Sequence, residues 1–143
     1  MKPSLPSADI ELLDSLVRSC RRLGLFYYPN TLARYQQNDL ASYVWICIEE
    51  VKRFNLALYK ICRALSGFSA HDKSGRQRGV TGHELTADEL QFPMPKNDPL
   101  WNAMCKEEWE TAITDDSDLT GLYDTMGEEW ISKSADFFRF AGL

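Results

Sequence analysis

The longest apolar segment, residues 39–65, restricts the fold of this chain more than any other part of the sequence. Its apolar residues recur at the three- and four-residue spacing of an α-helix. Tyr43, Ile46 and Phe54 lie on one side of this helix, while Ile48 and Leu58 lie elsewhere around it. Because apolar residues occupy most of the circumference, we expect a central helix about 40 Å long that other segments cover on all sides.

A helix is predicted at the N-terminal side, where Ser7 is a suitable cap and apolar residues follow from Ile10 to Cys20 at helical spacing. Gly24 is expected to end it, after Arg21 and Arg22 at its last turn.

Further helices are predicted after residue 85. Thr86 and Glu89 match a capping box. Asp98 and Pro99 match an N-cap and a first helical position. Another helix carries Trp109, and a last pair of helical segments covers 119–140. With no convincing strand, the predicted fold class is all-α: an irregular helical bundle of about 5–6 helices around one long central helix.

The chain is expected to form a single domain over residues 1–143, since its length and 44% hydrophobic content suffice for one core. Residues 67–84 are rich in glycine and basic side chains, and are predicted to be a flexible loop. Such a loop is either a disordered surface segment or a lid over a ligand.

Several classes of function are disfavoured by composition. The net charge of −5 argues against direct nucleic-acid binding. Because no two of the four cysteines are closely spaced, we expect buried thiols of an intracellular protein and no metal site. No cofactor fingerprint, signal peptide or membrane-spanning run is evident, so the predicted location is cytoplasmic or nuclear.

Three stretches of the sequence resemble a known family. They are RRLGLF at 21–26, WICIEEVKR at 45–53, and the stretch from Leu90 to Trp109 with its two prolines and a Leu-Trp-x-Ala segment. In this order and spacing they resemble the C-terminal half of the fungal-specific transcription factor regulatory domain, the middle homology region of fungal zinc-cluster and zinc-finger factors.

The resemblance implies an all-α regulatory region, but the chain has only half of the usual length and lacks a DNA-binding module. If the missing half normally covers one side of the central helix, that side must be buried in another way. We therefore expect a homodimer, with a protein regulator or a small-molecule ligand as further partners.

The candidate catalytic residues are Glu49, Glu50 and His71. A buried carboxylate costs several kcal/mol unless it is paired, and Lys52 and Arg53 provide partners at i+3 and i+4 from Glu49. The two glutamates are therefore interpreted as structural ion-pair members or as an acid or base in a pocket. His71 is interpreted as a solvated loop residue or as a general base.

Aromatic side chains supply the candidate binding residues. They are also the residues that most often fill a helical core. Those assigned to binding are Tyr43, Trp45, Trp101 and Trp109.

Two functions are therefore predicted. The first is a transcription-factor-like regulatory or interaction protein without DNA binding, acting through self-association or a partner and responsive to a ligand. The alternative is a cofactor-free helical enzyme, a cyclase or isomerase of fungal secondary metabolism, using a carboxylate or histidine in an aromatic pocket. The two differ in whether Glu49, Glu50 or His71 faces an apolar pocket.

Overall fold

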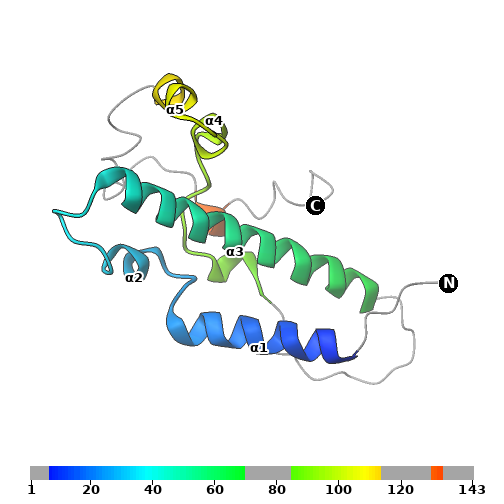
Figure 1. The fold of residues 1–143 in the computed structure, drawn as a ribbon. Coiled ribbons are helices and arrows are strands. Elements are labelled where there is room, and N and C mark those ends of the chain that lie inside the picture. Colours follow the sequence, from blue (N-terminus) through cyan, green and yellow to red (C-terminus); the bar gives the residue numbers. More distant parts are fainter. Residues whose placement is uncertain (1–6, 70–84, 114–129, 134–143) are drawn as a thin grey trace.

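The computed structural model describes residues 7–69, 85–113 and 130–133, and these residues form helices and connecting segments (Figure 1). The predicted all-α class is confirmed: the described residues contain five α-helices and two short 3-10 helices, and their only β-type pairings are isolated bridges. The elements are α1 (Ser7–Leu23), α2 (Tyr28–Leu32), α3 (Ala41–Ser69), η1 (Ala87–Glu89), α4 (Asp98–Trp101), α5 (Lys106–Ala112) and η3 (Ile131–Lys133).

The predicted central helix is α3, although its bounds differ from the prediction. It begins at Ala41 and not at Asp39, because the Asp39 carboxylate accepts a hydrogen bond from the Gln36 backbone N–H at 2.7 Å in the preceding turn. It ends at Ser69 and not at Leu65, so Gly67, placed in the loop by the sequence, is helical. The rest of that loop, residues 70–84, lies outside the described residues.

One side of α3 forms the core. Its buried residues share that side, and they include Trp45, Ile48, Asn55 and Cys62. The remaining core comes from α1, the turn into α2, the segment 85–93, α4 and η3. Its members outside 85–93 are Val17, Cys20, Phe26, Tyr28, Leu100 and Ile131. Each fully buried large apolar side chain stabilises the fold by about 1.5–3 kcal/mol.

The opposite side of α3 is exposed, which corrects the expectation that other segments cover this helix on all sides. Tyr43 is 58% exposed, Ile46 41%, Phe54 40% and Ile61 51%. With the exposed residues between and after them, they form a row at three- and four-residue spacing, which we call the α3 stripe: Tyr43, Ile46, Glu50, Phe54, Ala57, Ile61 and Ala64.

The segment after residue 85 is tied to two distant parts of the chain. Tyr28 N–H donates to Gln91 O at 3.0 Å, and Gln91 N–H donates to Phe26 O at the same distance. Ile131 N–H donates to Phe92 O at 2.8 Å. These backbone hydrogen bonds hold Leu90 and Phe92, both fully buried, in the core.

Two predicted caps are wrong. The Thr86 side chain makes no capping hydrogen bond, and Glu89 instead accepts two hydrogen bonds from Arg21 at 2.7 and 2.9 Å, which join η1 to α1. The N-cap of α4 is Asn97 and not Asp98, because Asn97 adopts a left-handed conformation at φ 50° from which its side chain accepts the Leu100 N–H.

Gly24 ends α1, as predicted, with φ +70°, a conformation that favours glycine. An added Cβ would lie 2.5 Å from Asn30 Nδ2. We expect Gly24→Ala to lower the free energy of unfolding by about 1–2 kcal/mol, as measured by urea denaturation followed by circular dichroism.

The matched control is the double variant Gly24→Ala/Asn30→Ala, compared with Asn30→Ala alone. It removes the contact with Asn30 but keeps the backbone strain, so it should recover only part of the loss. Equal stability of Gly24→Ala and the unchanged chain would contradict this account of the turn.

Candidate functional site

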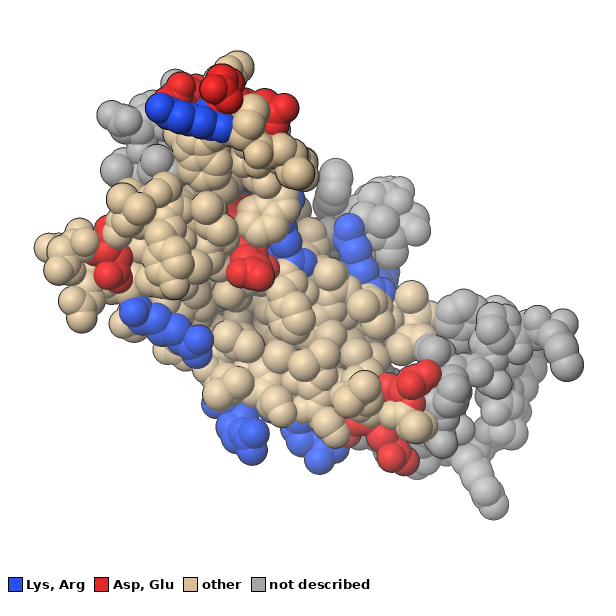
Figure 2. Space-filling model, in the orientation of Figure 1, with Lys and Arg blue, Asp and Glu red and all other residues tan. Residues whose placement is uncertain are grey.

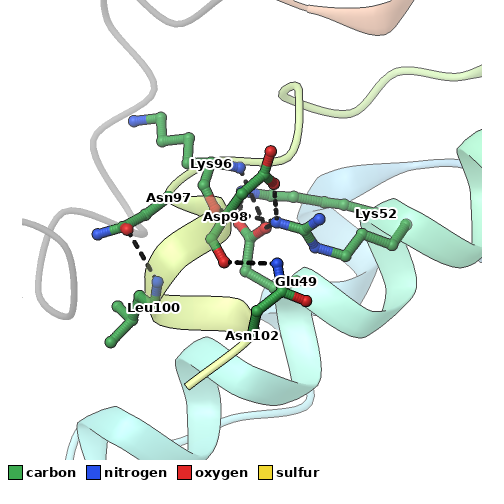
Figure 3. A network of polar contacts seen from close by, with 8 residues as sticks. Glu49, Lys52, Lys96, Asn97, Asp98, Leu100 and Asn102 are labelled. Carbon is green, nitrogen blue, oxygen red and sulfur yellow. Dashed lines mark hydrogen bonds and ion pairs between the residues drawn. The ribbon is translucent and has the colours of Figure 1, made fainter. Parts of the chain in front are cut away.

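The most concentrated polar chemistry of the described residues surrounds Glu49, whose side chain is fully buried in α3 (Figure 3). Lys52 Nζ lies 2.7 Å from Glu49 Oε1, and this lysine is itself only 3% exposed. The backbone N–H of Lys96 donates to Glu49 Oε2 at 3.1 Å. Both carboxylate oxygens are therefore occupied by partners from the protein.

Arg53 extends this network to α4. Its Nη2 lies 3.6 Å from Glu49 Oε2 and 2.9 Å from Asp98 Oδ1, and it donates to Lys96 O at 3.1 Å. Its guanidinium lies 4.8 Å from the centre of the Trp101 ring, within cation–π range. Through these contacts the chain at 96–101 is held against α3.

Asn97 connects α4 to α5. Its Oδ1 accepts the Leu100 N–H at 3.1 Å (Figure 3). Its Nδ2 donates to Ala112 O, also at 3.1 Å. Since the αL conformation favours asparagine among the residues with side chains, residue type and backbone conformation agree here. The Asn-Asp-Pro pattern therefore does mark a helix start, but the cap is its first residue and not its second.

The two candidate catalytic residues that the structure describes, Glu49 and Glu50, lie on different sides of α3. Glu49 is paired, in agreement with its interpretation as a structural ion-pair member, whereas Glu50 is exposed on the α3 stripe, on the other side of the helix. His71 lies outside the described residues. In this arrangement each Glu49 oxygen faces a protein partner, Oε1 the Lys52 ammonium and Oε2 the Lys96 backbone N–H.

The four candidate binding aromatics occupy three different places. Trp45, 2% exposed, makes an edge-to-face contact with Trp109 at 5.9 Å between ring centres. Trp101 is half-buried beneath Arg53. Tyr43 lies on the α3 stripe. Trp45 and Trp109 join α5 to α3, in the manner of core residues.

Two open hollows occur in the part of the chain that the structure describes, and neither is lined by a predicted site residue. The larger, about 600 Å³, lies between α4 and α5 and is lined mainly by apolar surface of Asn97, Pro99, Asn102, Ala103, Glu107, Glu108, Thr111 and Ala112. The smaller, about 260 Å³, is lined by Arg21, Gly24, Phe26, Tyr27, Glu89 and Gln91.

The cysteines differ in exposure. Cys20 and Cys62 are buried, as expected, and burial raises the pKa of both thiols. Cys105, by contrast, is exposed, because it lies at the N-cap of α5 and not within a helical core. Among residues 7–69, 85–113 and 130–133, no group of three His, Cys, Asp or Glu side chains has the arrangement of a metal site.

No helix in the described residues has the length and apolar content that crossing a membrane would require. Comparison with known protein families gives no matching family model, and neither the curated proteins nor the solved structures give a match. The resemblance to the fungal regulatory domain therefore stays a prediction.

The Glu49–Lys52 pair predicts a large stability difference between two adjacent glutamates. Glu49→Gln leaves the buried Lys52 ammonium without its counter-charge, so we expect a loss of about 3–5 kcal/mol in the free energy of unfolding. Glu50→Gln, on the exposed side, should change it by less than about 0.5 kcal/mol. Urea denaturation of both variants tests this.

The double variant Glu49→Leu/Lys52→Met should recover much of the loss, since it removes both buried charges together. If Glu49→Gln and Glu50→Gln were equally mild, Glu49 would not hold the network as described.

Tyr35 is a second group with a testable environment. Burial, followed by a hydrogen bond with Cys47, raises the pKa of its hydroxyl to about 12 from an ordinary value of 10.0. The folded protein thus favours the neutral form of Tyr35 more than the unfolded chain does. This preference adds to the free energy of unfolding in full below pH about 10, and the added stability is lost as pH rises through about 12.

We expect the tyrosinate absorbance at 295 nm to show a late step near pH 12 that disappears in Tyr35→Phe. The exposed Tyr27 provides a control, because Tyr27→Phe should keep that late step. If the late step persisted in Tyr35→Phe, the hydroxyl with the raised pKa would belong to another tyrosine.

Proposed function

We propose that this chain is an α-helical interaction domain of a transcription-factor-like regulator, which does not contact DNA itself and acts in the nucleus or cytoplasm by associating with itself or with a regulatory protein. The observation that carries the proposal is the α3 stripe. Its four large apolar side chains, Tyr43, Ile46, Phe54 and Ile61, are exposed along one side of the helix, and exposed apolar patches of this kind are typical of protein–protein contact surfaces.

The distribution of charge supports the same proposal. Figure 2 shows a broad face over α1 and α3 with few charged atoms within it and most Lys, Arg, Asp and Glu side chains at its margins. A surface of this kind is suited to a protein partner, whereas a phosphate backbone requires gathered basic side chains. The net charge of −5 agrees with this distinction.

The chemistry around Glu49 supports a regulator over an enzyme. A cyclase or isomerase of the predicted kind needs a carboxylate facing an apolar pocket. Glu49 is instead held by Lys52 and the Lys96 backbone, and Glu50 faces outward from α3. Neither Glu49 nor Glu50 lines either of the two hollows described above.

A tethering experiment tests the proposal. The full chain, fused to a heterologous DNA-binding domain in yeast cells, is expected to change expression of a matching reporter about fivefold or more relative to the DNA-binding domain alone. Phe54→Glu should remove this effect, because it places a charge in the middle of the α3 stripe.

Leu12→Glu is the matched control: Leu12 is 70% exposed on α1, outside the α3 stripe, and its substitution should leave the reporter response intact. Equal protein levels are checked by immunoblotting. A wild-type fusion that behaves like the DNA-binding domain alone would argue against the proposed function.

A further inference from the structure

We infer that the α3 stripe binds the α3 stripe of a second copy of this chain, with the two helices antiparallel and a two-fold axis that crosses the stripe next to Phe54, level with residue 55. This inference rests on the proposed function, since it takes self-association as the mode of action. It goes further by naming the face and its orientation.

The stripe has the shape that a helix-to-helix contact requires. Its seven residues, from Tyr43 to Ala64, follow one another at intervals of three or four, and they span about 31 Å at 1.5 Å per residue. This spacing gives one continuous row along the helix. The row lies opposite the buried side that contains Ile48 and Asn55, so a second copy can reach it without disturbing the core.

Charge along the stripe selects the antiparallel orientation. The acidic Glu50 lies toward its start, and the half-buried Lys60 borders it toward its end. A two-fold axis beside residue 55 places Glu50 of each copy opposite Lys60 of the second copy. A parallel pair would place like charges opposite each other, which is unfavourable.

Side-chain size along the stripe agrees with the same register. Two large residues, Tyr43 and Ile46, occupy the first part of the stripe, and the last part has one large residue, Ile61, followed by the small Ala64. The axis beside residue 55 brings Ile46 opposite Ala64 of the second copy and the two Phe54 rings close to each other. Facing a large residue with a small one lets two helices approach closely.

The expected affinity is modest. One helix face about 31 Å long provides an interface at the small end of the usual range, below about 1,200 Å² in total. Interfaces of this size are typical of weak, transient complexes, so we expect a dissociation constant on the order of 10 µM. The experiment must therefore cover concentrations on both sides of that value.

Sedimentation equilibrium of the full chain between about 1 and 200 µM tests the contact. The mass is expected to rise from 16.4 kDa to twice that value across this range. Phe54→Glu should weaken dimerisation about tenfold or more, while Leu12→Glu should leave it within about twofold. Circular dichroism melting checks that every variant is folded.

A charge exchange tests the orientation. Glu50→Lys and Lys60→Glu should each weaken the dimer about fivefold, because two like-charge contacts arise across the axis. The double variant Glu50→Lys/Lys60→Glu should return to within about twofold of wild type. In a parallel dimer residues 50 and 60 would each face their own copies, so neither single variant would weaken the dimer, and that result would overturn the orientation.

The outcomes separate this inference from the function on which it rests. A wild-type chain that stays monomeric at 200 µM, while Phe54→Glu still abolishes the reporter response, overturns self-association and leaves an interaction domain that binds another protein. A dimer that dissociates in Phe54→Glu, with a wild-type fusion that never affects the reporter, supports the interface and overturns the proposed function.

Discussion

The buried Glu49 carboxylate is the constraint on which the rest of the described structure depends. A charge without solvent must be matched by partners inside the protein, and here Lys52 supplies the counter-charge while the Lys96 backbone supplies a hydrogen bond. Because one partner is local and the other lies 47 residues away, the same carboxylate stabilises α3 and fixes the position of the segment that leads into α4. Arg53 adds a second connection to that segment through Asp98.

This arrangement divides α3 into two sides with different roles. The buried side combines apolar packing with hydrogen bonds; for example, Asn55 Nδ2 donates to Leu25 O at 2.9 Å. The segments that pack against this side must therefore match it in hydrogen-bond geometry as well as in shape. The α3 stripe is mostly apolar, with Glu50 within it and Lys60 at its border. A small and mostly apolar surface is suited to association that can form and dissociate.

Local sequence patterns predict much of this arrangement. Helical spacing identifies α3, and the i+3 and i+4 positions of Lys52 and Arg53 identify the local partners of Glu49. Spacing carries no information about partners that are distant in the sequence. It assigns Arg21 to a helix terminus and Glu89 to a cap, although these two side chains form an ion pair with each other across 68 residues. It also does not reveal the α3 stripe, because apolar periodicity indicates that a residue avoids water but not which surface covers it.

The same limit explains why aromatic content is a poor guide to the site. Trp45 and Tyr43 are two residues apart and both are aromatic, yet on a helix they are separated by about 200° around the axis, one directed into the contact with Trp109 and the other to solvent. Of these two rings, only that of Trp45 is covered by other described residues of the chain. We propose that the exposed Tyr43 ring, in line with Ile46, Phe54 and Ile61, is covered by a partner. The function of this domain is therefore to be sought on the outer side of α3 and not in the polar network beneath it.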